Sequence, residues 1–384
     1  MNALYDVVII GAGPAGAFAS FNCSTLGLKT LLIDKAKFPR YKTCGGGLVK
    51  KGYDLIPFDI SPAVERECFS ISLFDHESTH QFTVRKDYPL VKMVMRDKFD
   101  NLLVESAIES GSQFIDDTRV SGIESSGESI NIKTNRGSFT AKYLIAADGV
   151  NGIVSKFLNN KFNFNRTPAL EYEVFVDEKT FSEYNNSARF DFGFIPEGYG
   201  WIFPKRDHLS VGIASFNPKV RNIKSYMNDY LKSLSFEKFN LEKHGFIIPF
   251  NSKWKTFHSG NILFAGDTAG LPDPITAEGI SNALLSGKIA AEILTNHFAE
   301  KNVVGEIYSE KIAAEIGNEN RYAQYVASLF YRSSTVRKFL LKRNGIKLAE
   351  LMSDIIAGKR KYSHLVRKPI NYVKLIKNRN GKIN

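Results

Sequence analysis

The most constraining feature of the chain is a glycine-rich turn that follows directly on an apolar segment near its beginning. Residues 5–10 read Tyr-Asp-Val-Val-Ile-Ile and lead into Gly11-x-Gly13-x-x-Gly16. This order is typical of a strand, a tight turn and the start of a helix that binds the pyrophosphate of a dinucleotide. Gly11 permits the turn, Gly13 lets the backbone approach the phosphates, and Gly16 lets the helix pack against the strand. The free N–H groups of the helix start favour an anion there.

A second apolar segment supports this interpretation. Residues 29–34, Lys-Thr-Leu-Leu-Ile-Asp, read as another buried strand. It ends on Asp34, about 20 residues beyond the glycines, where a carboxylate accepts a hydrogen bond from the adenosine ribose. We therefore expect Asp34 and the adjoining Lys35 to contact the cofactor. The alternative is a glycine-rich turn in some other α/β protein.

Length and composition indicate a globular protein of two domains, or of one large domain with insertions. The chain has 384 residues, of which 43% are hydrophobic and 24% charged,. No apolar run approaches the length of a membrane span, and the beginning lacks the features of a signal peptide. Cys23, Cys44 and Cys68 show neither disulfide nor zinc spacing, and the seven histidines form no ligand cluster,. We expect a cytoplasmic location and no metal.

The positive charge of the chain is concentrated near its end. Residues 321–384 contain 16 Lys or Arg and two acidic residues, a net charge of +14, whereas the whole sequence carries +11. Segments such as 334–343 and 372–377 mix these cations with large apolar side chains. Basic amphipathic segments of this kind favour a membrane surface, so we expect peripheral attachment to the cytoplasmic membrane. The alternative is a solvated basic helix pair, and we expect no nucleic acid partner.

The order of the expected elements indicates an α/β fold with a discontinuous Rossmann-type domain. A helix is expected from Arg96 to about Ser110, and a buried strand at 142–147,. Residues 165–255 alternate with period two, which predicts an antiparallel sheet with one face free to cover a ligand. We expect a nucleotide-binding domain at 1–67, 90–164 and 256–300, a substrate domain at 68–89 and 165–255, and a basic helical segment at 301–384.

Two further segments carry small residues after a strand. They are Ala147-Asp148-Gly149 and Gly266-Asp267-Thr-Ala-Gly270. With the first glycines they resemble the FAD-binding domain of para-hydroxybenzoate hydroxylase-like flavoproteins. The resemblance implies that Asp267 contacts the ribityl chain and pyrophosphate, and that a helix from about Ala277 points its N-terminus at the flavin. The alternative for Asp267 is an ordinary helix cap. The family's Ser-x-Val-Arg is replaced here by residues 152–155, Gly-Ile-Val-Ser.

Two arginines are expected near FAD, and the resemblance implies this role for the first of them, Arg96. Arg96 begins its helix where the family carries an arginine that reaches the cofactor, and Arg40 follows in the loop after Asp34. The alternative for each is an ordinary surface arginine. The expected FAD contacts are Gly11, Gly13, Ala15, Gly16, Asp34, Lys35, Arg40, Cys44, Gly45, Arg96, Val120, Asp148, Gly149, Gly266, Asp267, Gly279 and Ile280.

A more specific match lies in the expected second domain. Residues 196–205 read P-x-x-Y-x-W-x-F-P-K, and they accompany Cys44-Gly-Gly and Glu278-Gly-Ile. Together these resemble the geranylgeranyl reductase family over about residues 1–300. The resemblance implies FAD-dependent saturation of isoprenoid C=C bonds in archaeal lipids, phytyl chains or menaquinone side chains. Tyr199, Trp201 and Phe203 alternate and so share one strand face, which with Pro204 would line a polyprenyl tunnel. The alternative is an aromatic core stripe.

Reduction of an isolated alkene needs a hydride, which reduced flavin N5 supplies, and a proton from a nearby acid. Cys44 lies in a glycine-rich loop and matches the family's active-site cysteine, so it is the first candidate for this acid. Tyr199 is a second candidate, and the face of Trp201 would stabilise developing positive charge in a dry site. The alternative for Cys44 is a small buried hydrophobic residue.

Other functions remain compatible with the flavoprotein motifs. An aromatic monooxygenase or halogenase belongs to the same superfamily, but halogenases carry W-x-W-x-I-P where this chain reads Tyr199-Gly-Trp-Ile-Phe-Pro204. A second nucleotide fingerprint for NAD(P)H is missing from the sequence. A non-enzymatic flavin- or lipid-binding protein is a third possibility, although the glycines and Asp267 are intact. The sequence leaves the electron donor open between NADPH, a ferredoxin-type protein and a quinol.

Overall fold

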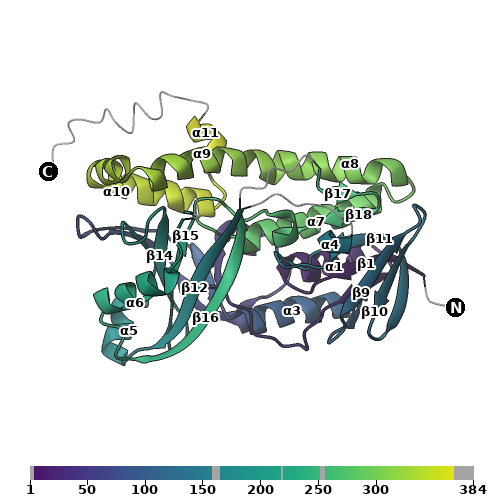
Figure 1. Cartoon of the computed structure of the whole chain (residues 1–384), viewed down its shortest axis with the longest axis horizontal. Helices are drawn as coiled ribbons and strands as arrows, with labels where there is room; N and C mark the ends of the chain where they lie inside the picture. Colours follow the sequence, from purple (N-terminus) through teal and green to yellow (C-terminus); the bar gives the residue numbers. More distant parts are fainter. Residues whose placement is uncertain (1–3, 158–164, 218, 251–255, 367–384) are drawn as a thin grey trace.

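The structure is a computed structural model that describes residues 4–157, 165–217, 219–250 and 256–366. The molecule is elongated, and its two large sheets lie next to each other along the long axis (Figure 1). A layer of helices from the last third of the chain lies across both sheets on one side. The site described below lies where the two sheets and these helices meet.

The first sheet has a parallel centre. Its strand order is β17-β18-β11-β1-β2-β8, with a β9-β10 meander on β11. Strands β18, β11, β1, β2 and β8 run parallel, as expected for a Rossmann-type domain,. The strand bounds are β1 Leu4–Ile10, β2 Thr30–Ile33, β8 Gln113–Ile115, β9 Val120–Ser125, β10 Ile130–Thr134, β11 Gly137–Ala146, β17 His258–Ser259 and β18 Ile262–Phe264.

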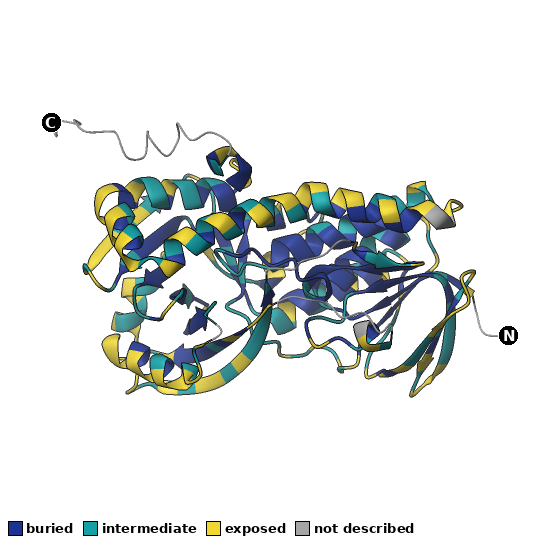
Figure 2. Cartoon of the chain, turned by 45° about the horizontal axis from the view of Figure 1, so that its top comes forward, coloured by how far each residue is buried: buried dark blue, intermediate teal, exposed yellow. Residues whose placement is uncertain are grey.

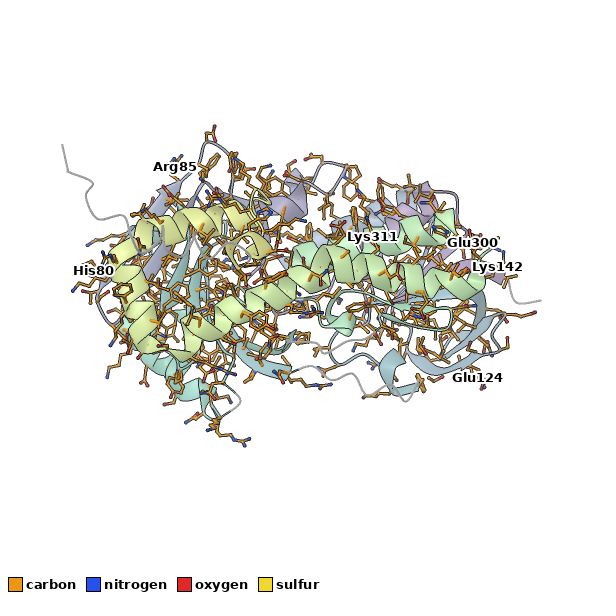
Figure 3. All side chains as sticks on the ribbon, turned by 90° about the horizontal axis from the view of Figure 1, so that it is seen from above. His80, Arg85, Glu124, Lys142, Glu300 and Lys311 are labelled. Carbon is orange, nitrogen blue, oxygen red and sulfur yellow. The ribbon has the colours of Figure 1, made fainter. Side chains whose placement is uncertain are left out.

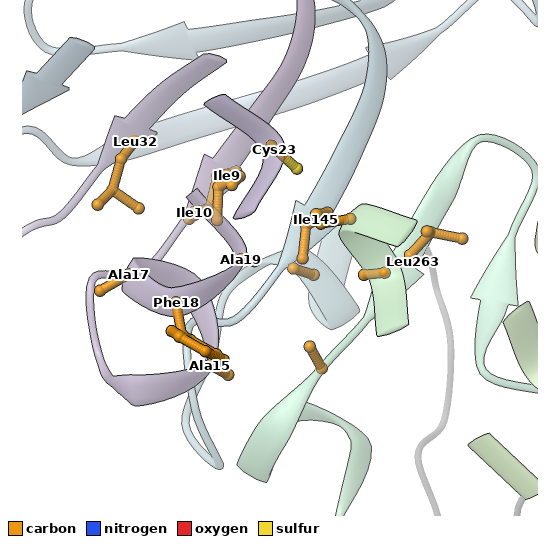
Figure 4. Packing of buried hydrophobic residues seen from close by; sticks show 14 of the residues in the cluster. Ile9, Ile10, Ala15, Ala17, Phe18, Ala19, Cys23, Leu32, Ile145 and Leu263 are labelled. Atoms are coloured by element: carbon orange, nitrogen blue, oxygen red, sulfur yellow. The ribbon is translucent and has the colours of Figure 1, made fainter. Parts of the chain in front are cut away.

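Helices pack against this sheet, because its central strands are apolar and buried. Helix α1 (Pro14–Thr25) packs against α3 (Arg96–Glu109) and α7 (Ile280–Asn296). Figure 4 shows the resulting core, in which Ile9, Phe18 and Leu263 come from different elements and pack together. Cys23 lies in this core and Cys68 in the neighbouring one, and both are free and fully buried.

The second sheet is antiparallel except for one strand pair. Its order is β16-β12-β15-β14-β13-β5-β6, and only β13 and β5 run parallel within it. One face packs under α5 (Glu178–Tyr184) and α6 (Ile223–Ser233), whereas the opposite face carries an aromatic stripe. The bounds are β5 Ser70–Asp75, β6 His80–Arg85, β12 Asn165–Phe175, β13 Ser187–Phe192, β14 Gly198–Pro204, β15 Leu209–Ser215 and β16 Asn240–Phe250.

Short elements join the two large sheets. The strands of a small antiparallel sheet, in the order β3-β7-β4, alternate along the chain with strands of the two large sheets. Its first strand directly follows the Cys44 loop, which it therefore anchors. The bounds of these elements are β3 Gly47–Val49, α2 Lys50–Tyr53, η1 Ser61–Ala63, β4 Val64–Cys68, β7 Val91–Val94, α4 Val154–Phe157 and η2 Gly266–Ala269.

The C-terminal helices connect the two halves of the molecule. The order is α8 (Lys301–Ile312), the π-helical turn η3 (Ala313–Gly317), α9 (Asn318–Arg332), α10 (Ser334–Ile356) and α11 (Tyr362–Val366). Helix α8 packs on α7 and β18, whereas α10 packs on β5 and β6 of the second sheet. Figure 2 shows that these helices are buried toward the sheets and exposed on the other side. Figure 3 gives the view from above, with Lys142 of β11 and His80 of β6 toward opposite ends of the molecule.

The Rossmann-type sheet, the second antiparallel sheet and the helical C-terminal segment confirm the predicted fold class. The predicted start of the long helix at Ala277 was wrong, because α7 begins at Ile280. Ala277 instead has φ of +53° and lies in a turn organised by Asp273, whose carboxylate accepts the N–H groups of Ile275 and Thr276. The second basic stretch predicted to bind membranes, 372–377, lies outside the described residues. No helix of the described part is both long and apolar enough to cross a bilayer.

The close contact between α1 and α7 depends on a glycine. A Cβ atom on Gly287 would overlap the carbonyl oxygen of Ala15, a backbone atom that cannot move aside cheaply. We expect Gly287→Ala to lower the free energy of unfolding by about 1–3 kcal/mol through overpacking. The matched control is Gly317→Ala, where a Cβ meets nothing closer than 3.7 Å. That change should be neutral or stabilising by up to about 1 kcal/mol. Equal melting temperatures for the two variants would contradict this account.

Candidate active site

The glycine-rich turn has the geometry that its sequence predicts. Gly11 has φ of +101°, and a Cβ there would overlap the Ala147 carbonyl oxygen. A Cβ on Gly16 would overlap the Gly11 carbonyl oxygen, so this glycine sets the approach of α1 to β1. Gly11, Gly13 and Ala15 line the central cavity of the protein, whereas Gly16 lies behind them. Gly16 therefore shapes the turn rather than facing a ligand.

Asp34 braces this turn from the end of β2. Its Oδ2 accepts the N–H of Ala12 at 2.7 Å, and its Oδ1 accepts the N–H of Ala36 at 2.8 Å. Asp34 and Lys35 also line the cavity. The carboxylate thus holds the glycine-rich loop in place, a second task that the sequence pattern did not indicate.

Two arginines face the turn. Arg96 donates from Nε and Nη2 to the two oxygens of Asp100, at 2.7 and 2.8 Å, and Arg40 Nη2 lies 3.1 Å from Asp100 Oδ2. A Cβ on Gly13 would lie 3.7 Å from Arg40 and 3.9 Å from Arg96. Burial opposes the charge on Arg96, but Asp100 raises the pKa of its guanidinium overall. Asp100 was missed in the sequence, although its position four residues after Arg96 on a helix could have indicated the pair.

The Nη1 atom of Arg40 is buried and has no hydrogen-bond partner among the described residues. Arg40 lines the cavity next to the glycine-rich turn. A buried guanidinium N–H without a partner is costly unless a ligand satisfies it. The pyrophosphate of a dinucleotide, held between the backbone N–H groups of the turn and Arg40, fits this arrangement.

The two later loops are tied together at the next part of the cavity. Asp148 accepts the N–H groups of Ile153 and Val154 through Oδ2 and the Thr268 hydroxyl through Oδ1, at 2.5, 3.0 and 3.2 Å. The Thr268 hydroxyl oxygen in turn accepts the N–H of Gly149 at 2.8 Å. Burial raises the pKa of Asp267, with the charges of Lys42 and Arg96 opposing it. The loops predicted to bind one cofactor therefore form one hydrogen-bonded unit.

The Cys44 loop is held in place by a buried lysine. Lys205, which is fully buried, donates from Nζ to the carbonyl oxygens of Gly45 and Val94, at 2.7 and 3.0 Å. Cys44 is partly exposed, its N–H donates to Glu171 Oε2 at 3.0 Å, and its Sγ accepts the N–H of Gly46 at 3.4 Å. Lys205 is the last residue of the P-x-x-Y-x-W-x-F-P-K motif. The motif did not indicate that Lys205 holds a loop 160 residues away in the sequence.

Aromatic side chains form the opposite wall. Tyr199, Trp201 and Phe203 share one face of β14, with ring centroids 6.1 and 6.3 Å apart, and all three line the cavity. A Cβ on Gly45 would lie 2.9 Å from Trp201 Nε1, so the Cys44 loop packs directly on this wall. Pro204, which was predicted to line the wall, is not among the cavity-lining residues. It follows Phe203 in β14, and consecutive residues of a strand point to opposite faces of the sheet,.

Tyr199 does not direct its proton into the cavity. Its hydroxyl donates to the carbonyl oxygen of Thr276 in the turn before α7. Burial raises the pKa of Tyr199 well above the ordinary value for a tyrosine. This geometry favours a positioning role for Tyr199, which holds the turn that precedes α7.

These parts surround one continuous cavity of about 730 Å³. It extends from the glycine-rich turn, past the Cys44 loop, to the aromatic wall, and Ile356 of α10 reaches it from the C-terminal helices. The predicted site residues that line it are Gly11, Gly13, Ala15, Asp34, Lys35, Arg40, Cys44, Gly45, Arg96, Val120, Asp148, Gly149, Tyr199, Trp201, Phe203, Gly266, Asp267, Gly279 and Ile280.

A buried acidic pair lies against the Cys44 loop and was not predicted. Glu171 and Glu173 point to the same face of β12, and both are almost fully buried. Burial, with the charge of Glu173 beside it, raises the pKa of Glu171 to about 7. Burial also acts on Glu173, but the contact with His208 lowers the pKa of Glu173 overall. The residue types gave no signal, because alternating glutamates in a strand usually face solvent.

Lys42 adds a titratable cation to the same cavity. Its Nζ lies 3.1 Å from the centroid of the Phe246 ring. Burial lowers the pKa of Lys42 to about 8, and the charge of Arg96 acts in the same direction. Among the described residues, no three His, Cys, Asp or Glu side chains gather as metal ligands.

Comparisons with known proteins agree with this geometry. The family described as "FAD binding domain" matches residues 4–222. A digeranylgeranylglycerophospholipid reductase of Methanococcus vannielii is 32% identical over 370 residues, covering 91% of this chain and 90% of the relative. An uncharacterized protein of Methanosarcina barkeri is 36% identical over 335 residues, covering 85% and 84%. The chain belongs to the geranylgeranyl reductase family of FAD-dependent oxidoreductases.

Solved structures show how widely this fold is shared. A geranylgeranyl bacteriochlorophyll reductase-like protein from Thermoplasma acidophilum aligns with a TM-score of 0.77 and 22% identity, over 98% of this chain and 96% of that one. The flavin-dependent brominase Bmp2 aligns with a TM-score of 0.75 and 20% identity, over 98% and 100%. At these identities the likeness concerns the fold alone. The cofactor of the family, FAD, fits the turn, the paired arginines and the Asp148 and Asp267 loops of this chain.

Arg40 gives a direct test of the cofactor site. We expect Arg40→Met to weaken FAD binding about 10- to 100-fold, because a hydrogen bond to a charged group contributes about 1.5–3 kcal/mol. The matched control is Lys37→Met, which removes an exposed cation from the same loop outside the cavity lining. Titration of apoprotein with FAD, followed by flavin fluorescence, measures both variants. Equal affinities would show that Arg40 does not bind the cofactor.

Proposed function

We propose that this protein reduces C=C bonds in the polyprenyl chain of a lipid or quinone. The observation that carries the proposal is the continuity of the cavity, which joins the cofactor-binding loops to a wall of aromatic side chains with Cys44 between them. Curated relatives named digeranylgeranylglycerophospholipid reductase support a substrate with geranylgeranyl chains. A long apolar chain suits the wall, because Trp201 and Phe203 offer large apolar area with few rotatable bonds.

The residues of the chain have distinct tasks in this proposal. Reduced FAD would supply the hydride from N5. Trp201 and Phe203 hold the alkene and exclude water, which strengthens the electrostatic interactions inside the site. Cys44 donates the proton to the second carbon. Tyr199 holds the turn before α7, and Lys205 holds the Cys44 loop against the wall.

The experiment is an anaerobic half-reaction. Protein reduced with dithionite is mixed with geranylgeranyl lipid, which has no quinone ring to accept the electrons, and the absorbance of oxidised flavin is followed. Dithionite makes the result independent of the natural electron donor. Reoxidation by the prenyl compound supports the proposal. Flavin that stays reduced until oxygen is admitted contradicts it and favours an oxygen-dependent hydroxylase or halogenase; a flavin-dependent brominase shares the fold of this chain.

Cys44 is tested in the same half-reaction. We expect Cys44→Ala to keep FAD but to lose about 100-fold or more in the rate of reoxidation by prenyl lipid, the usual contribution of a general acid. The matched control is Cys68→Ala, because Cys68 is fully buried and does not line the cavity. Full activity of Cys44→Ala would exclude the thiol as the proton donor.

We further propose that α9 and α10 bring the protein to an anionic membrane. Tyr325 and Leu329 on α9, and Phe339 on α10, are exposed apolar side chains. The exposed cations Lys342 and Arg343 lie on α10, with the Arg343 guanidinium 5.7 Å from the Phe339 ring centroid. Apolar side chains among cations are the features that bind an interfacial helix to anionic lipid.

Charge removal tests this surface. We expect the double variant Lys342→Gln, Arg343→Gln to bind vesicles that contain phosphatidylserine about 30-fold more weakly, since each cation contributes about 1 kcal/mol. The control removes Lys224 and Lys232, exposed lysines of α6. Sedimentation with vesicles, compared with pure phosphatidylcholine, measures the binding. Equal losses in the two variants would indicate a general charge effect and contradict a membrane role for α10.

A further inference from the structure

A chain of polar side chains connects the Cys44 loop with solvent through the second sheet. We propose that Glu171, Glu173 and His208 form a proton relay that carries protons from the surface at Asp207 to the cavity beside Cys44. The inference rests on the proposed reductase function, which consumes one proton for each bond reduced. It assigns a role to buried acids that the cofactor site and the aromatic wall do not use.

The inner end of the relay lies at the cavity. Glu171 lines it, and its Oε2 accepts the backbone N–H of Cys44 at 3.0 Å and faces the Tyr41 hydroxyl at 3.4 Å. Its Oε1 accepts the Ser210 hydroxyl at 2.8 Å. The carboxyl group is therefore fixed against the backbone of the proposed acid, at the wall of the site where the proton is needed.

The middle of the relay is a carboxyl pair. Glu171 and Glu173 lie two residues apart on one face of β12, both are almost fully buried, and each acts on the pKa of the other. Two neighbouring negative charges in a dry site repel, so burial and the charge of Glu173 favour a proton on Glu171,. The pair is thus a proton store that lies next to the cavity.

The outer end reaches solvent. Glu173 Oε2 lies 3.1 Å from His208 Nε2, and both atoms are buried without another hydrogen-bond partner among the described residues. His208 Nδ1 lies 2.7 Å from Oδ1 of Asp207, whose side chain is 76% exposed. Although burial opposes it, the contacts with Glu173 and Asp207 raise the pKa of His208. An imidazole between a buried and an exposed carboxylate can pass protons from one to the other.

The groups around the pair set its charge. Lys205, directly after β14, is a buried cation whose charge acts on both glutamates. From β16, His244 is paired in register with Glu171, and its ring lies 4.3 Å from that of Tyr41. Cys44 and Tyr41 face the pair from the loop. Glu173, in contact with His208, holds the negative charge more readily, whereas burial and that charge keep the proton on Glu171.

The proton balance of the relay is simple. For each alkene reduced, one proton leaves Glu171 toward the cavity, where the alkene carbon receives it through Cys44. A proton from Glu173 and His208 replaces it, and solvent at Asp207 reprotonates His208. No electrons move through these residues, since the hydride comes from the reduced cofactor.

The first test measures the proton store without substrate. Infrared difference spectra of the FAD-containing protein between pH 5 and pH 9 should show the carbonyl stretch of a protonated carboxyl group that disappears near pH 7. Glu171→Gln should lack this band, while Glu242→Gln, which changes an exposed glutamate opposite Glu173, should keep it. A band that persists in Glu171→Gln would overturn the assignment of the stored proton.

The second test measures delivery. In the anaerobic half-reaction we expect Glu171→Gln to slow reoxidation by prenyl lipid about 100-fold or more, a usual contribution of acid–base catalysis. Wild-type rates should fall as pH rises through the pKa of Glu171, because the donated proton is then lost, and the variant should not show this fall. Reoxidation by oxygen should stay within about twofold. The glutamine side chain keeps an oxygen that can accept the Cys44 N–H, so the Cys44 loop should stay in place. Loss of the pH dependence in Glu171→Gln would therefore reflect the missing carboxyl group and not a displaced loop.

Two further variants test the outer part of the relay. Glu173→Gln and His208→Gln leave Glu171 in place and should slow the same step with a raised solvent deuterium isotope effect. Wild-type rate and pH profile in all three variants would overturn the relay. If the wild-type protein itself does not react with prenyl lipid, the proposed function fails, and the infrared titration still decides whether Glu171 stores the proton.

Discussion

The arrangement of the site depends on the buried ammonium group of Lys205. This side chain follows the end of β14 and donates to the carbonyl oxygens of Gly45, in the Cys44 loop, and Val94, at the end of β7 in the small sheet. A buried charge is costly unless hydrogen bonds and opposite charge compensate it. Lys205 has both, because Glu171 and Glu173 lie near it. It therefore fixes the Cys44 loop between the aromatic wall and the cofactor loops.

The two sheets provide different parts of the chemistry. The parallel sheet ends in loops that are held by Asp34, Asp100 and Asp148, three carboxylates that satisfy backbone or arginine donors and keep the cofactor surface rigid. The antiparallel sheet offers an apolar face with few polar atoms, apart from the acids beneath Cys44. Ile356 of α10 also lines the cavity, so the C-terminal helices, which pack on both sheets, contribute to its wall.

The parts of the site that the sequence predicted are those in which neighbouring residues act together. The glycine-rich turn and the alternating wall of β14 follow from local spacing, and the Asp148 and Asp267 segments follow from the family resemblance. Lys205, Glu171 and Asp100 were missed because their partners are distant in the chain or because their burial follows from tertiary packing. The helix start at Ala277 was misplaced because a turn organised by the Asp273 carboxylate precedes α7. Pro204 does not line the cavity, because it follows Phe203 in β14 and so points to the other face of the strand,.

The central claim is that this cavity saturates prenyl double bonds with electrons from reduced FAD. The most direct measurement is the mass of the prenyl compound after one anaerobic turnover with reduced protein. The account predicts a gain of about 2 Da for each bond reduced, one hydride and one proton. An unchanged mass, or a product that carries oxygen or halide once air is admitted, would contradict it.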